Sequence, residues 1–331
     1  MKEIIAGVDI GGTKIAVALE DARRREKIAA RRIAMDVNLA AEAMIDRLFA
    51  AIDEMTADGG GAAAKIVSIG IGCPSPLDVE RGLVKSPSNL RHWDRFPIVE
   101  RFRAKFGGAA VRLENDANAA ALGEYVDGAG RGFADILYVT VSTGIGGGII
   151  LGGEIYRGVA AAAGEIGHTI VDPDGERCNC GSIGCLETIA AGVHIARRAR
   201  ARLAAGEPSI ISELAAAAGE DVSAKTVLDA AARGDALALE IWREICRALA
   251  LGIGNAVSLL APEAVVVGGG IAAAAGDRLL GPLREMVPSY VSMVPKDKIK
   301  ITAAALGGES GVHGALALAR AAASNSRQNY A

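Results

Sequence analysis

Residues 4–19 read IIAGVDIGGTKIAVAL, and residues 136–151 read ILYVTVSTGIGGGIIL. In each stretch a short apolar run ends at a glycine-rich turn and a second apolar run follows, which is typical of two strands joined by a tight connection. The pattern returns about 130 residues along the chain. It therefore predicts two related α/β halves that face each other across a cleft.

Further strands and helices are expected around these two stretches. Apolar runs predict strands at residues 28–34, 66–71, 111–113 and 264–267, and apolar residues at helical spacing predict helices at residues 39–55, 117–126 and 237–249. A chain of 331 residues is long for one hydrophobic core. We expect a smaller domain of residues 1–117 plus 308–331 and a larger domain of residues 118–307.

The composition excludes several classes of protein. Charged residues make up 23% of the chain and the net charge is −3, so nothing electrostatic indicates nucleic acid. The most apolar stretch, residues 248–261, contains Asn255 and is shorter than the roughly 20 residues that a membrane span needs. The N-terminus lacks the apolar core and cleavage site of a signal peptide. We expect a soluble, cytoplasmic protein that binds neither nucleic acid nor membrane.

Four potential metal ligands gather within eighteen residues: His168, Cys178, Cys180 and Cys185. Three thiolates and one imidazole fill a tetrahedral zinc site, and four protein ligands leave no position for an activated water. The sequence therefore predicts a structural zinc ion. The alternatives are accidental clustering or a disulfide, but Cys178 and Cys180 are too close in sequence for an easy bridge, and nothing indicates export.

The first glycine turn carries groups that suit phosphate. Gly11 and Gly12 allow the backbone to approach a ligand closely and to point N–H groups at it, and Thr13 and Lys14 add further donors. Asp9 would repel phosphate directly, so it makes sense only beside a cation such as Mg²⁺. An ordinary hairpin turn would explain the two glycines but not their flanking Asp9 and Lys14.

Two more glycine-rich segments follow. Thr143 and Gly144 belong to a connection, residues 142–148, that has more glycines than a turn requires. The other segment lies between a predicted strand and a helix-like run and consists of Gly268, Gly269 and Gly270. With Ala273 they also fit the dinucleotide-binding fingerprint, a pattern that is weak alone. A P-loop is excluded because Gly-Lys-Ser/Thr does not occur in the chain.

Asp116 is the candidate general base. It lies where a predicted strand ends and a helix begins, at the edge of the sheet where α/β proteins bind ligands. Asn115 beside it supplies both a donor and an acceptor. Alternatively, Asp116 is simply the N-cap of the following helix.

Taken in order, these motifs resemble those of the ROK family of sugar kinases, in the actin-like ATPase superfamily, over essentially the whole chain. The resemblance rests on residues 9–14, 114–118, 143–148, the zinc ligands with Glu165, and residues 262–270. It implies an α/β, two-lobed actin-like ATPase (ribonuclease H-like) fold with a central cleft and a structural zinc loop. One departure is Pro74-Ser75-Pro76, where the family often has glycine after proline in a sugar-side loop; the later residues 86–90 fit the family better.

The resemblance also implies roles for the site residues. Asp116 would take the proton from the sugar 6-hydroxyl as that oxygen attacks the γ-phosphate of ATP. Four residues would bind the other hydroxyls: Asn115, Glu165, His168 and Glu187. His168 would bind zinc with one ring nitrogen and the sugar with the other. Phosphates would lie at Thr13, Lys14, Thr143 and Gly144, with Asp9 near Mg²⁺ and the nucleoside near residues 268–270.

The expected activity is ATP-dependent phosphorylation of D-glucose. Kinases for N-acetylmannosamine, fructose, mannose and allose share these motifs, although Glu165 and His168 together with Glu187 favour a plain hexose. Non-catalytic repressors of the same family carry a DNA-binding domain before the first phosphate motif, which begins here at Asp9 and leaves no room for one. The resemblance further implies a homodimer or homotetramer.

Overall fold

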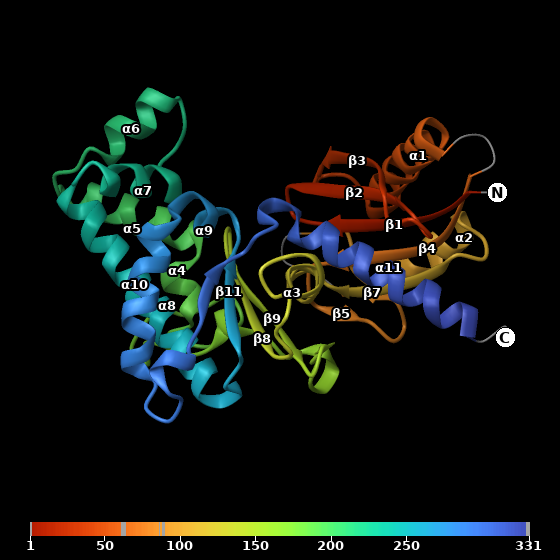
Figure 1. The fold of residues 1–331 in the computed structure, drawn as a ribbon. Helices are drawn as coiled ribbons and strands as arrows, with labels where there is room; N and C mark the ends of the chain where they lie inside the picture. Colours follow the sequence, from red (N-terminus) through yellow and green to blue (C-terminus); the bar gives the residue numbers. More distant parts are fainter. Residues whose placement is uncertain (1, 61–63, 86, 88–89, 329–331) are drawn as a thin grey trace.

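Each of the two quoted stretches forms part of its own five-stranded sheet in the computed structural model, which describes residues 2–60, 64–85, 87 and 90–328 (Figure 1). Across the first sheet the order is β3 (Lys27–Ala34), β2 (Lys14–Asp21), β1 (Lys2–Ile10), β4 (Ala64–Cys73) and β7 (Ala110–Asn115). Across the second it is β10 (Glu154–Ile155), β9 (Ile145–Leu151), β8 (Ile136–Val141), β11 (Ala264–Gly268) and β12 (Ile301–Ala303). A short antiparallel pair, β5 (Leu77–Asp78) and β6 (Leu83–Val84), follows β4 in the chain as a separate sheet.

The two sheets have the same topology. In the first, β1, β2 and β3 are antiparallel neighbours, and β4 and β7 run parallel to β1. In the second, β8, β9 and β10 are antiparallel neighbours, and β11 and β12 run parallel to β8. This repetition confirms the prediction of two related α/β halves, which form two lobes (Figure 1).

Helices cover both faces of the first sheet, which explains why its central strands are apolar throughout. α1 (Ala41–Gly60) packs on β3 and β4 through the expected stripe of Met44, Leu48, Ile52 and Met55. α11 (Ser310–Gln328) lies along the opposite face (Figure 1). A Cβ on Gly70 would lie 1.9 Å from the Ala315 carbonyl oxygen, so glycine sets how closely this helix approaches. α2 (Ile98–Lys105) contacts β7.

Most of the remaining helices cover the second sheet. They are α4 (Leu186–Ala190), α5 (Gly192–Ala204), α6 (Ile211–Ala218), α7 (Ala224–Ala232), α8 (Ala236–Leu260), α9 (Gly270–Ala275) and α10 (Asp277–Tyr290). Leu237, Ile241, Ile245 and Leu249 are buried, so the predicted helix stripe is confirmed in α8. The apolar residues 248–261 form the end of this helix and the residue after it. Within the described part of the chain, no helix is both long and apolar enough to cross a membrane.

α3 (Asp116–Asp127) joins the two lobes. It packs against α11 on one side and against β8 and β9 of the second sheet on the other. The contact with α11 is close, because a Cβ on Gly314 would lie 1.6 Å from the Ala119 carbonyl oxygen. The expected domain boundaries fall near the ends of these helices, at residues 117/118 and 307/308, and stay a prediction.

Candidate active site

The parallel strands β1, β4 and β7 bring two carboxylates together at one edge of the first sheet. Asp9 is paired in register with Gly72, and Asn115 with Cys73. A Cβ on Gly72 would lie 3.6 Å from Asp9 Oδ1 and 3.8 Å from Asp116 Cα. Asp9 and Asp116 therefore flank one glycine at the carboxyl ends of the strands, where open α/β sheets bind their ligands.

Asn115, not Asp116, caps α3. The Asn115 side chain accepts the backbone N–H of Asn118 at 3.0 Å, so the interpretation of Asp116 as the N-cap is wrong. Asp116 Oδ1 accepts the N–H of Ala117 at 2.9 Å and Nδ2 of Asn115 at 3.1 Å. Both bonds use one oxygen, so they fix the orientation of the carboxylate, and within the described part of the chain no other side chain bonds to Oδ2.

Both carboxylates are held in an environment that disfavours their charge. Burial raises the pKa of Asp116 to about 6. The hydrogen bond from Ala117 lowers this pKa and so opposes the effect of burial, whereas the charge of Glu165 raises it further. Burial and then the charge of Asp116 raise the pKa of Asp9 to about 7, while Lys14 lowers it. A cation beside Asp9 would relieve this repulsion. The donor set fits a hard cation such as Mg²⁺, which prefers carboxylate oxygens.

The first glycine turn, residues 10–14, connects β1 to β2 next to Asp9. The N–H of Gly11 donates to the Lys14 carbonyl at 2.9 Å, which closes the turn. Thr13 is exposed at its tip, and Gly12 and Lys14 are partly exposed beside it. The turn therefore has a hydroxyl and an ammonium group next to Asp9, and their binding of phosphate stays a prediction.

The second glycine turn is shorter than its sequence indicates. Only residues 142–144 form the turn, in which the Ser142 N–H donates to the Gly144 carbonyl at 3.0 Å. Gly146, Gly147 and Gly148 instead lie in β9 and pair with residues of β8, so the prediction of a connection over all of residues 142–148 is wrong. At Gly147 and Gly148 other backbone packs closely against β9: a Cβ would lie 2.6 Å from the Gly164 carbonyl oxygen at Gly147 and 2.7 Å from the Ala117 carbonyl oxygen at Gly148.

The third glycine segment lies against the second turn. Gly269 has φ +92°, and a Cβ there would lie 2.5 Å from the Val141 carbonyl oxygen, so only glycine fits. Beside it is a pocket of about 530 Å³ that Thr143, Gly192, Gly270 and Ile271 help to line. Gly268 packs against Tyr138 instead. This mainly apolar pocket next to a glycine turn could hold a flat nucleoside.

The second turn has three predicted sugar ligands beside it: Glu165, His168 and Glu187. One of them, Glu187, already has a hydrogen bond within the chain. The short 3-10 helix η2 (Ile166–His168) packs on β9, so Glu165 and His168 lie close to Glu187. Partial burial raises the pKa of Glu165; the charge of His168 opposes this rise and that of Glu187 adds to it. Glu187 Oε2 already accepts the N–H of Ile145 at 3.0 Å. Its other oxygen is the one that can receive a ligand hydroxyl.

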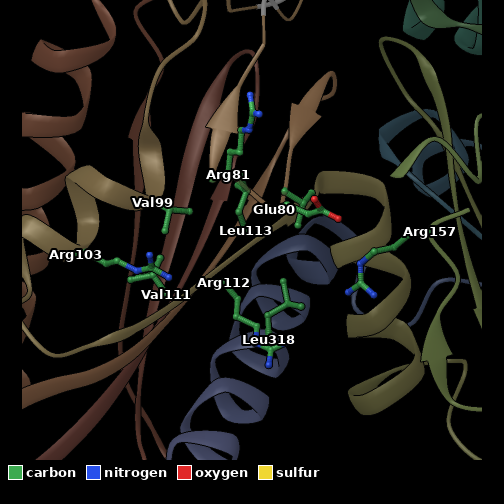
Figure 2. Close-up of a pocket in the computed structure, with 11 residues that line it drawn as sticks. Glu80, Arg81, Val99, Arg103, Val111, Arg112, Leu113, Arg157 and Leu318 are labelled. Carbon is green, nitrogen blue, oxygen red and sulfur yellow. The ribbon is translucent and has the colours of Figure 1, made fainter. Parts of the chain in front are cut away.

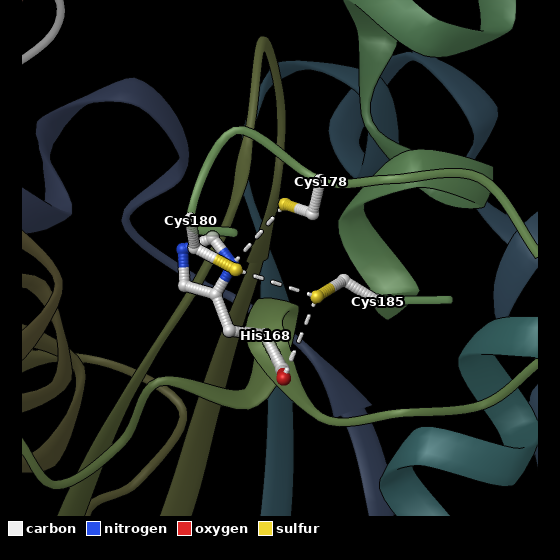
Figure 3. Close-up of side chains that lie close together, drawn as sticks. All are labelled: His168, Cys178, Cys180 and Cys185. Atoms are coloured by element: carbon white, nitrogen blue, oxygen red, sulfur yellow. Dashed lines mark hydrogen bonds between the residues drawn. The ribbon is translucent and has the colours of Figure 1, made fainter. Parts of the chain in front are cut away.

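The four predicted metal ligands converge on one point (Figure 3). Their ligand atoms all lie within 4.8 Å of one another. Cys178 Sγ is 3.7 Å from His168 Nδ1, and the Sγ atoms of Cys180 and Cys185 are 3.6 Å apart. Thiolates bonded to one tetrahedral zinc ion at 2.3 Å lie roughly 3.8 Å apart, so the donors and their spacing fit zinc. Because Nδ1 faces the thiols, the other ring nitrogen is left to point away from the cluster (Figure 3).

The site also contains residues to which the sequence assigns no role. Ser75 Oγ accepts a hydrogen bond from Asn115 Nδ2 at 2.9 Å, and the peptide bond between Ser75 and Pro76 is cis. Ser75, which stands where the family often has glycine, thus places its hydroxyl beside Asn115, the neighbour of the candidate base Asp116. The pocket residues Gly192 and Ile271 carry no sequence signal, because only the fold brings them to Thr143. Residues 86, 88 and 89 of the segment 86–90 lie outside the described residues.

The comparisons with known proteins agree with this fold. The model of the ROK family matches residues 5–322. The chain is 37% identical over 316 residues to a glucokinase of Thermotoga maritima, covering 95% of this chain and 96% of that one. It is 33% identical over 318 residues to an N-acetylmannosamine kinase of Escherichia coli O127:H6, covering 95% and 97%. The crystal structure of a ROK family glucokinase from Streptomyces griseus in complex with glucose and AMPPNP is similar with a TM-score of 0.77 and 35% identity, covering 96% of this chain and 99% of that one.

Two lobes of matching topology, glycine turns at their sheet edges and a His-Cys₃ loop define an actin-like protein of the sugar kinase type. The chain belongs to the ROK family.

Proposed function

We propose that this protein is an ATP-dependent glucokinase that transfers the γ-phosphoryl group of ATP to the 6-hydroxyl of D-glucose. The observation that carries the proposal is the Asp116 carboxylate, which is fixed through Oδ1 and has a pKa of about 6. A base of this pKa is ionised at neutral pH yet remains basic enough to accept a proton in the transition state. Glucose is favoured over other sugars because relatives at 34–37% identity are glucokinases.

In this proposal Asp116 Oδ2 accepts the proton of the 6-hydroxyl as its oxygen attacks phosphorus. Asn115 and the pair Glu165 and His168 bind the remaining hydroxyls from opposite lobes, so the sugar is held between them. Glu187 contributes its remaining oxygen. Such a site rejects analogues that lack a hydroxyl, because a buried partner is then left unpaired.

The nucleotide would lie between the glycine turns. The first turn, with Thr13 and Lys14, and the second, with Thr143 and Gly144, donate to the phosphates, and the pocket beside Gly270 holds the nucleoside. A magnesium ion beside Asp9 would neutralise phosphate charge when bound. The structural zinc ion would fix the His168 ring and with it one wall of the sugar site.

A panel of sugars in a coupled assay of ADP release tests the proposal. We expect the highest kcat/KM for glucose, and no sugar-dependent turnover with 6-deoxyglucose, which lacks the acceptor hydroxyl. A clear preference for N-acetylmannosamine, fructose, mannose or allose would overturn the choice of sugar. An absence of turnover with every hexose, combined with tight binding of duplex DNA, would favour a sugar-sensing repressor. The homodimer or homotetramer stays a prediction that light scattering can check.

A further inference from the structure

A buried carboxylate lies directly before the proposed base. Glu114, in β7, has a fully buried side chain. Its Oε1 accepts the N–H of Asn115 at 3.1 Å and Nδ2 of Asn118 at 3.0 Å. Its Oε2 accepts Nε of Arg157 at 2.8 Å and lies 2.7 Å from Nη2 of the same side chain. Arg157 is therefore the cation that compensates this buried charge.

Arg157 comes from the opposite lobe. It follows β10 of the second sheet and precedes the 3-10 helix η1 (Val159–Ala161), in the segment that leads to Glu165 and His168. In the close-up its side chain extends from the second lobe towards α3 (Figure 2). The ion pair between Arg157 and Glu114 thus joins the segment that carries the proposed sugar ligands to the segment that carries the base.

A short chain of hydrogen bonds links this ion pair to Asp116. Glu114 binds the backbone N–H of Asn115, and Asn115 donates through Nδ2 to Asp116 Oδ1. Asn118, the other partner of Glu114, donates its own N–H to the Asn115 side chain at 3.0 Å. A displacement of Glu114 would therefore move the cap of α3 and the carboxylate of Asp116 with it.

Arg157 also separates Glu114 from solvent. The Arg157 side chain is 42% exposed, whereas that of Glu114 is 0% exposed. On its outer side is a hollow of about 270 Å³ that Arg81, Arg112 and Leu318 also line (Figure 2). Separating the lobes would remove from Glu114 its cation and the two short contacts that Arg157 makes with Oε2, which is unfavourable. The ion pair thus favours the arrangement of the lobes seen here.

We propose that Arg157 is a positioning residue, which couples the approach of the two lobes to the placement of Asp116 by pairing with Glu114. The inference rests on the proposed kinase function. A sugar held by Asn115 from one lobe and by Glu165 from the other draws together the same two segments that the ion pair joins. Sugar binding and formation of the pair therefore reinforce each other, and phosphoryl transfer is fastest when both are present.

Arg157→Met tests the proposal, because methionine fills much of the space of the arginine stem without its charge. We expect kcat with glucose to fall about 10- to 100-fold, as expected when a reacting group is misplaced by about 1 Å, and glucose binding to weaken. Adenosine binding should not change, since Arg157 is not among the residues that line the nucleoside pocket. Arg157→Lys should recover part of kcat. The double variant Arg157→Met/Glu114→Gln should exceed Arg157→Met in kcat, because no buried charge is left unpaired.

The matched control is Arg198→Met. Arg198 pairs with Glu244 at 3.1 Å, and both residues lie in the second lobe, on α5 and α8. We expect kcat of this variant to equal that of the native protein. Equal losses in Arg157→Met and Arg198→Met would mean general destabilisation and would overturn the inference. Native kcat and native glucose affinity in Arg157→Met would overturn it as well.

Hydrogen exchange separates this inference from the proposed function. Arg157→Met should speed exchange of the amides of residues 113–118, which surround Glu114 and begin α3, and Arg198→Met should not. If the native protein phosphorylates no hexose, the proposed function fails, while faster exchange in this segment still supports the coupling between the lobes. Unchanged exchange at residues 113–118 in Arg157→Met would overturn the coupling whatever the enzyme phosphorylates.

Discussion

Asp116→Asn should remove activity and at the same time stabilise the fold. Burial raises the pKa of Asp116 from 3.8 to about 6. Between pH 3.8 and pH 6 the native state holds more protons at Asp116 than the unfolded state does. The stability that the protonated Asp116 contributes is therefore fully present below pH 3.8 and is lost as the pH rises through 6. At pH 7.5 the ionised carboxylate therefore costs about 3 kcal/mol at most, from about 2 pKa units at about 1.4 kcal/mol each.

Asparagine removes this cost without changing the shape of the side chain. Its carbonyl oxygen can still accept the N–H of Ala117 and Nδ2 of Asn115. The loss of the charge also lowers the pKa of Asp9, which Asp116 helps to raise. We therefore expect Asp116→Asn to be more stable than the native protein at pH 7.5 by up to about 3 kcal/mol, and turnover to fall about 10²- to 10⁴-fold through loss of the general base.

Denaturant unfolding of both proteins in magnesium-free buffer, at pH values from 7.5 to 4, measures the difference directly. The advantage of Asp116→Asn should shrink as pH falls below 6. Asp127→Asn, at the other end of α3, is the control. Burial alone would raise the pKa of Asp127, but hydrogen bonds and charge from His313 and Arg320 lower it overall. Asp127→Asn should therefore lose stability and keep its turnover.

Two results would refute the reasoning about Asp116. If Asp116→Asn is less stable than the native protein at pH 7.5, the carboxylate is not a destabilising charge in the fold. If the variant turns over glucose at nearly the native rate, Asp116 is not the general base. Because the first result concerns the fold and the second the chemistry, each part of the reasoning can fail alone.

Three further predictions concern the metal, the base and the packing of the lobes. Cys180→Ser should lower zinc content, melting temperature and glucose affinity together, whereas Cys246→Ala, outside the cluster, should leave zinc content unchanged; elemental analysis, thermal unfolding and calorimetry measure these three quantities. A profile of kcat/KM against pH should fall about tenfold per unit below roughly pH 6, where Asp116 becomes protonated. Gly314→Ala should cost about 3 kcal/mol or more in denaturant unfolding, since its Cβ would lie 1.6 Å from a carbonyl oxygen, whereas Gly281→Ala, which meets nothing within 4 Å, should not destabilise the fold.

Features that depend on neighbouring residues in the sequence were predictable. The strands around the first turn, the apolar stripe of α8 and the zinc ligand set follow from local periodicity and spacing, and the structure contains all three. The juxtaposition of Asp9 and Asp116 was predictable in part, since each follows from its position at the end of a strand. That β4 lies between their two strands and holds them on either side of Gly72 follows only from the sheet order.

Features that depend on close approach between distant segments were not predictable. Gly146, Gly147 and Gly148 look like part of a phosphate-binding turn, but they lie in β9 where other backbone packs against it. Asn115 and Asp116 are both good capping residues, and only the backbone angles decide that Asn115 caps α3. Packing against segments far away in the sequence decides the glycines, and the cap depends on backbone angles that the residue types alone do not fix.

Of three carboxylates at the same sheet edge, one has its charge compensated by the chain and two do not. Glu114 is fully buried and is compensated by Arg157 and by two further hydrogen bonds. Asp116 has its Oδ1 oxygen occupied, and the pKa values of Asp116 and Asp9 are both raised by burial. The chain thus pairs Glu114, which holds residues 114–118 in place, with a cation, and leaves the charges of Asp116 and Asp9 without full compensation. Such groups gain most from a ligand that brings a cation or a proton, and for that reason Asp9 and Asp116, rather than Glu114, are the groups at which we place magnesium and the sugar hydroxyl.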